Sequence, residues 1–191
     1  MKFILNTAID PHFCAIFDKN NNLIERVVWE NRKKDAEMVW SALNKCDLDK
    51  INFIGGLSGP GGFSSLRAAA GILNSLCFAN NLQVRQIRSD RLVSAFLRKT
   101  DFQGTFLLNS FGGSVFLLQK TGDLEIISVE NAVEKFKNEK VFVGVLPKEK
   151  QAFFKQKVDL EIKDLEMVLL EELEKTEPQK SFLPDYQFSP V

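Results

Sequence analysis

The sequence has little of what most active sites are built from. Its single histidine, His12, lies between a proline and a phenylalanine, and the cysteines at positions 14, 46 and 77 lack the close spacing of a metal-binding pair. No phosphate-binding signature of the G-x-x-x-x-G-K-[ST] or G-x-G-x-x-G type occurs. A catalytic serine–histidine or cysteine–histidine arrangement would have to use His12, whose neighbours indicate a structural role. We therefore expect a chain that is not an enzyme and that holds no metal or cofactor.

Net charge and long hydrophobic runs are lacking as well. The 25 basic and 25 acidic residues cancel, which argues against broad electrostatic binding of a nucleic-acid backbone. No apolar run approaches the length of a membrane span, and the apolar start at residues 3–5 ends too soon for a signal peptide. Cys14 and Cys77 have apolar neighbours, as reduced thiols in a core do. We expect a soluble cytosolic protein.

Hydrophobic periodicity predicts a mixed α/β fold for the first hundred residues. Strands at residues 2–6, 13–17 and 23–29, joined by short turns, should form an antiparallel meander. Strands and helices then alternate, which makes neighbouring strands parallel and the sheet mixed. The further predicted elements are a helix at 34–46, a strand at 51–57, a helix at 66–79 capped by Ser64 or Ser65, a strand at 83–87 and a helix at 90–97 capped by Ser89 or Asp90.

The pattern restarts after residue 100. We place a lobe boundary there, with a first lobe at residues 1–100 and a reduced second lobe, including the C-terminal tail, at residues 101–191. The tail from Pro178 should be irregular and cross the surface. The predicted elements are strands at 105–108, 115–119, 124–129, 140–145 and 158–162, turns at 112–113 and 121–123, a short helix at 132–136 and a helix capped by Asp164.

Two of the predicted helices carry apolar or very small residues on one side. Such a side can pack inside this chain, or it can be a face for helices of another protein, because small side chains allow close approach. The sequence leaves both explanations open. The residues concerned are Ala36, Val39, Trp40 and Leu43 on the first helix and Leu66, Ala69, Ala70 and Leu73 on the second.

A glycine-rich loop is the most specific local feature. It lies between a predicted buried strand and a helix start, where free backbone N–H groups and the helix dipole favour an anion. Physically it is either a phosphate cradle or a tight turn shaped to meet a partner. The segment reads Gly59-Pro60-Gly61-Gly62-Phe63-Ser64-Ser65-Leu66-Arg67.

This segment resembles the Gly-Pro-Gly-Ser-Phe-Thr-Gly-Leu-Arg motif of the TsaB (YeaZ) family of tRNA threonylcarbamoyladenosine biosynthesis proteins. Six residues match the motif, namely Gly59, Pro60, Gly61, Phe63, Leu66 and Arg67. Gly62, Ser64 and Ser65 depart from it. Weaker likenesses place Leu5-Asn6-Thr7 at the family's Ile-Asp-Thr, Asn109-Ser110-Phe111 at its Asp-Ala-Arg, and residues 184–188 at its closing Pro-x-Tyr-Leu-Arg.

The resemblance implies an actin-like ATPase fold, shared with sugar kinases, Hsp70 and actin, with mixed sheets flanked by helices and a reduced second lobe. It also implies a non-catalytic scaffold that binds a TsaD-like protein. With a TsaE-like ATPase, this complex would support threonylcarbamoyl transfer to adenosine in tRNA, and tRNA would be contacted only through the complex. The two helices would then be the partner-binding face, and a homodimer could form through the same face.

Two departures bear on nucleotide chemistry. Asn6 stands where nucleotide-hydrolysing members of the wider fold carry the aspartate that holds Mg²⁺ through water, and Asn109 also replaces an acidic residue. Both changes argue against ATP hydrolysis by this chain alone. The alternative is a nucleotide-binding enzyme of the same fold, kinase-like or M22 peptidase-like, that uses the glycine loop for phosphate.

Overall fold

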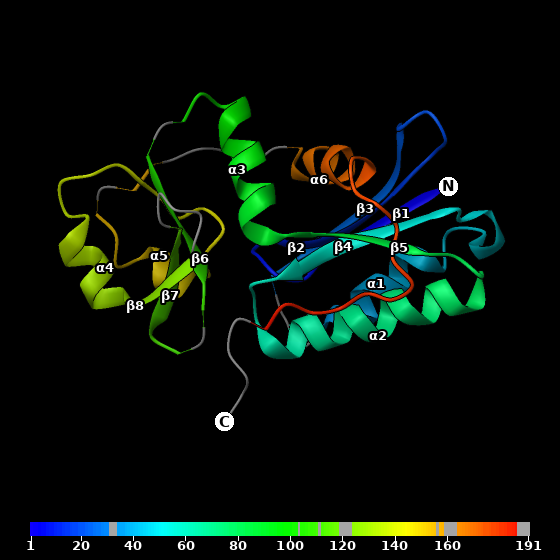
Figure 1. Ribbon diagram of the computed structural model, residues 1–191, viewed down its shortest axis with the longest axis horizontal. Helices are drawn as coiled ribbons and strands as arrows, with labels where there is room; N and C mark the ends of the chain where they lie inside the picture. The colour runs from blue at the N-terminus through cyan, green and yellow to red at the C-terminus, as the bar shows by residue number, and fades with distance from the viewer. Residues whose placement is uncertain are drawn as a thin grey trace.

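The structure is a computed structural model that describes residues 1–30, 34–102, 104–110, 112–118, 124–155, 157–158 and 164–186. Figure 1 shows two sheets with helices packed against them. The predicted turn at 121–123, residues 159–162 of the last predicted strand, Phe111 and residues 187–188 lie outside the described residues. In the described part of the chain, no helix is both long and apolar enough to cross a membrane.

The first sheet is mixed, as predicted, with the strand order β3-β2-β1-β4-β5. The first three strands form an antiparallel meander, and β4 and β5 continue the sheet in parallel with β1. β1 and β2 are almost wholly buried, because helices cover both faces of the sheet, and their sequences are correspondingly apolar. The strands are β1 (Lys2–Asn6), β2 (His12–Phe17), β3 (Leu23–Trp29), β4 (Phe53–Gly59) and β5 (Val84–Arg88).

Helices cover both faces of this sheet. α1 (Asp35–Leu43) and α2 (Phe63–Ala79) pack on one face, and α6 (Leu165–Glu174) packs on the other beside α3 (Ser89–Lys99) (Figure 1). A short 3₁₀ turn, η2 (Leu48–Lys50), precedes β4.

Two helix starts differ from the prediction and a third agrees with it. α2 begins with Gly62 at its N-cap, so the serines expected to cap it lie inside its first turn. α3 begins at Ser89 behind Arg88, and Asp164 does stand at the N-cap of α6. None of these three helices has a capping hydrogen bond from a side chain. The first residue of each helix therefore depends on the conformation of the backbone before it, which residue preferences alone do not predict.

The second sheet has the order β8-β7-β6-β9, with β9 parallel to β6 and the others antiparallel. One face packs on α4, and the other face joins the core formed by α3, α6 and the first sheet. The strand expected at 140–145 is shorter than predicted. The elements are β6 (Thr105–Asn109), β7 (Ser114–Leu118), β8 (Leu124–Ser128), α4 (Val129–Lys135), β9 (Val141–Phe142) and α5 (Lys148–Gln151).

The C-terminal tail returns to the first sheet. Gln179 pairs with Val84 through two backbone hydrogen bonds of 2.8 and 2.9 Å, beside the edge strand β5. Phe182 is then fully buried, with its backbone N–H and C=O bound by the side chain of Asn74. Through residue 186 the tail is irregular, as predicted, but at Phe182 it enters the core instead of only crossing the surface. In space, α6 and the tail accompany the first sheet, although the division at residue 100 assigns them to the second lobe.

Candidate functional site

The glycine loop is packed against two other segments of its own chain. A Cβ atom on Gly59, whose φ is +120°, would lie 2.7 Å from the carbonyl oxygen of Asp185. A Cβ atom on Gly61 would lie 2.5 Å from the carbonyl oxygen of Ala8. Glycine is required where another backbone comes this close. Two segments of the chain's own backbone therefore approach the loop closely, the tail at Gly59 and the β1–β2 turn at Gly61.

A pocket of about 360 Å³ lies between the loop and the second sheet. It brings together the loop, the turn after β6, the start of α5 and the end of the tail, four segments far apart in the sequence. Of the predicted site residues, it is lined by Pro60, Gly61, Gly62 and Phe63, while Arg67 is not part of its wall. The other lining residues are Asn109, Ser110, Gly112, Phe116, Pro147, Glu149, Lys150, Asp185 and Tyr186.

Lys150 is a buried cation in the wall of this pocket. Its Nζ donates hydrogen bonds to Asn109 Oδ1 at 2.9 Å, to the carbonyl of Ser110 at 2.7 Å and to the carbonyl of Ser114 at 2.6 Å. A buried ammonium group requires such acceptors. The Asn109 side chain thus holds a lysine and fixes the turn after β6. The sequence gives no hint of this, because Lys-Glu-Lys-Gln has the pattern of a solvated helix.

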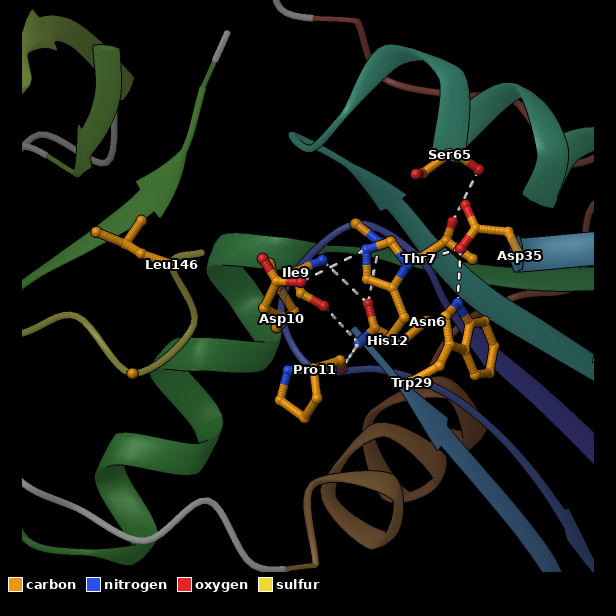
Figure 2. A network of polar contacts seen from close by, with 12 residues as sticks. Asn6, Thr7, Ile9, Asp10, Pro11, His12, Trp29, Asp35, Ser65 and Leu146 are labelled. Carbon is orange, nitrogen blue, oxygen red and sulfur yellow. Dashed lines mark hydrogen bonds and ion pairs between the residues drawn. The ribbon is translucent and has the colours of Figure 1, made fainter. Parts of the chain in front are cut away.

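Asn6 uses both ends of its amide to hold the β1–β2 turn (Figure 2). Its Nδ2 donates to the carbonyls of Ile9 and Pro11 at 3.0 and 2.9 Å, and its Oδ1 accepts from the N–H groups of Ala8 and Ile9 at 3.0 and 3.2 Å. An aspartate could not make the first two bonds, since an ionised carboxylate only accepts. Asn6 therefore has a structural role, because all four of these hydrogen bonds lie within the β1–β2 turn.

His12 belongs to a second buried network, also drawn in Figure 2. Its Nδ1 lies 2.8 Å from Asp35 Oδ1, which also accepts a 2.7 Å hydrogen bond from Trp29 Nε1. Burial by itself would raise the pKa of the Asp35 carboxyl, but the hydrogen bonds from His12 and Trp29 outweigh it and hold that pKa below its usual value. The network joins β2, β3 and α1, and its residues do not line the pocket beside the glycine loop. Its position supports the structural role predicted for His12; the part played by Asp35 was not foreseen.

Five of the eight helix residues expected at a partner face are buried within this chain, on the side that packs against the sheet, and cannot form a docking surface. They are Val39, Leu43, Leu66, Ala69 and Leu73. Ala36 and Trp40 are exposed, Trp40 to 56%, and Ala70 is half-buried. The outer side of α2 is formed by other residues, namely Phe63, Ser64, Arg67, Gly71, Ser75, Phe78 and Ala79.

Carboxylates, thiols and imidazoles do not gather into a metal-binding set. Over the ranges that the structure describes, no three such side chains are placed to hold an ion together. The pocket has two carboxylates in its wall, Glu149 and Asp185, and the second is paired with Arg88.

Comparison with known proteins extends the description of the fold. No protein-family model and no curated protein sequence matches the chain. Among solved structures, YeaZ from Pseudomonas aeruginosa superposes with a TM-score of 0.66 at 16% identity, covering 97% of this chain and 100% of that one. An uncharacterized protein described as similar to the peptidase YeaZ from Pseudomonas aeruginosa gives a TM-score of 0.65 at 17% identity, covering 97% and 99%. Over nearly its whole length, this chain has the fold of YeaZ.

Proposed function

We propose that this chain is a TsaB-like member of the actin-like fold, a cytosolic scaffold that binds a TsaD-like protein. In that complex, with a TsaE-like ATPase, it supports threonylcarbamoyl transfer to adenosine in tRNA and does not itself catalyse the step. The full-length likeness to YeaZ and the glycine-loop motif at residues 59–67 support the assignment. The use of Asn6 inside its own turn supports a chain without metal-dependent hydrolysis.

The observation that carries the proposal is the outer side of α2. Within its 17 residues, Arg67 is the only charged side chain, in a protein of which 26% is charged. Phe78 is 91% exposed at one end of this side and Phe63 is 40% exposed at the other. Between them, Gly71 has open space above it. Charge depletion with exposed aromatic residues is typical of the centre of a protein–protein interface.

The first test is light scattering coupled to size-exclusion chromatography. The chain is measured alone and mixed with the TsaD-like protein of the same organism. We expect a mass equal to one copy of each. Separate peaks at concentrations well above micromolar would contradict the proposal, whereas a homodimer of the chain alone is compatible with it because both partners would use the same face.

Gly71→Glu locates the interface. The new side chain meets nothing within 4 Å in this chain, so the fold is kept, but it blocks close approach of a partner helix. Gly113→Glu is the matched control, since Gly113 is equally open but lies far from α2 in sequence, in the turn between β6 and β7. We expect the complex to be lost with the first variant and kept with the second. Equal binding by both variants would move the interface away from α2.

The enzyme alternative is tested with ATP. Among the described residues, the pocket beside the glycine loop is the only feature that supports nucleotide binding. Two glycines of the loop, however, are already packed against the chain's own backbone. We expect no heat of binding with ATP and Mg²⁺ and no phosphate release. Binding with turnover would replace the scaffold by the nucleotide-dependent enzyme.

A further inference from the structure

Arg67 lies on the outer side of α2 and stacks on an aromatic ring of the same helix. Its guanidinium lies over the ring of Phe63, 5.5 Å from the ring centroid. The Phe63 ring in turn packs against Tyr186, with 4.9 Å between centroids and an interplanar angle of 49°. These three residues, the Arg67–Phe63–Tyr186 stack, join the first turns of α2 to the described part of the tail. An arginine stacked on an aromatic ring loses less entropy when it binds a partner.

The tail fixes the aromatic end of the stack. Phe182 is anchored in the core, and the Leu183 N–H donates to Gln86 Oε1 at 2.9 Å. The Asp185 N–H then donates to the carbonyl of Ser58 at 2.7 Å. Tyr186 therefore follows a backbone attached at successive points.

Within the described residues, Arg67 forms no ion pair with a carboxylate. By contrast, Arg26, Arg88 and Arg91 each form an ion pair with an aspartate or glutamate. The printed neighbours of the Arg67 guanidinium are aromatic, with the Phe63 ring beside it and the Tyr186 ring packed on Phe63. An arginine that is stacked on an aromatic ring and has no carboxylate of its own can form an ion pair with a carboxylate of another protein.

We propose, on the basis of the function proposed above, that the Arg67–Phe63–Tyr186 stack is the anchor of the partner face and takes an aspartate or glutamate side chain of the partner. A protein carboxylate fits better than a phosphate backbone. Nucleic-acid binding draws on several cations together, and α2 offers one. The carboxylate also gives the interface a direction, because the opposite end of α2, at Phe78, is uncharged.

The test is the salt dependence of binding to the TsaD-like protein of the same organism, measured by calorimetry at 50 and 500 mM NaCl for wild type, Arg67→Met, Arg67→Lys and Tyr186→Ala. Methionine keeps the apolar contact with Phe63 and removes the charge. We expect wild-type binding to weaken with salt, and Arg67→Met to bind at least about tenfold more weakly at low salt with little salt dependence left. Arg67→Lys should keep the salt dependence. Tyr186→Ala should weaken binding by a few fold and leave the salt dependence unchanged.

The outcomes separate this inference from the proposed function. If wild type and Arg67→Met bind alike, with the same salt dependence, while Gly71→Glu still abolishes binding, the anchor is refuted and the scaffold stands. If wild type does not bind at all, both are refuted. Binding of tRNA to the chain alone that depends on Arg67 would replace the protein carboxylate by a phosphate.

Discussion

At the scale of single residues, Asn6 shows how one amide can organise a turn. Asn6→Asp would place an acceptor against the carbonyls of Ile9 and Pro11, which are now 3.0 and 2.9 Å from Nδ2. Two hydrogen bonds are lost and a buried charge is added, so we expect the free energy of unfolding to fall by about 2–3 kcal/mol or more. Urea denaturation measures it, with Asn20→Asp in the exposed β2–β3 loop as the control. Undiminished stability, together with new Mg²⁺ binding, would show that the turn is built to accept the aspartate.

Asp35 makes stability depend on pH in a stated direction. Its pKa in the folded protein is lowered, so its contribution is present above the unfolded pKa of about 4 and is lost as the pH falls through the folded value. Asp35→Asn should therefore be less stable than wild type at pH 7, and the difference should shrink toward pH 3. Denaturation curves across this range test it, with the exposed Glu37→Gln on the same helix as control. Curves for wild type and Asp35→Asn that stay parallel down to pH 3 would assign the acid sensitivity to other carboxylates.

At the scale of elements, periodicity locates most strands and helices because burial is periodic along them. β1 and β3 have the predicted bounds, since each alternates or runs apolar between turn residues. The same argument cannot tell which neighbour a helix face will meet. It leaves Val39 and Leu73 open between this chain's own core and a partner, and the family resemblance implies the partner, whereas their own sheet covers them in the structure. It also gives no sign that Lys150 is buried, because only the fold brings Asn109 and the turn after β6 to its ammonium group.

The tail is an element whose role its composition hides. Phe182 is fully buried, and its ring lies over Gly56, where a Cβ would come within 3.6 Å. Phe182→Ala should lower the free energy of unfolding by about 3–5 kcal/mol. The neighbouring exposed Leu183 supplies the control, since Leu183→Ala should leave thermal unfolding nearly unchanged. Equal melting temperatures for the two variants would mean that the tail only rests on the surface.

At the scale of the whole molecule, the two sheets share a core. Phe106, Phe116 and Phe142 of the second sheet belong to the same buried cluster as Ile9, Leu57 and Phe96. The ring of Phe142 lies 6.1 Å from that of Phe96 on α3, across the boundary that the sequence places near residue 100. The sequence predicts two lobes because the strand pattern restarts there, whereas the contact between them depends on side chains that are equally apolar in either arrangement.

This shared core predicts that the chain unfolds as one cooperative unit. Both tryptophans, Trp29 and Trp40, lie in the first half of the chain, so their fluorescence reports on the first sheet and the helix packed on it. Phe142→Ala removes a buried ring in the second sheet and should destabilise it by about 3–5 kcal/mol. If the sheets unfold together, the free energy of unfolding reported by tryptophan fluorescence in urea falls by this same amount. The fluorescence transition also coincides with the loss of circular dichroism. A tryptophan transition that stays in place would mean that the second sheet unfolds alone, and that the pocket wall formed by Lys150 can open while the α2 face remains intact.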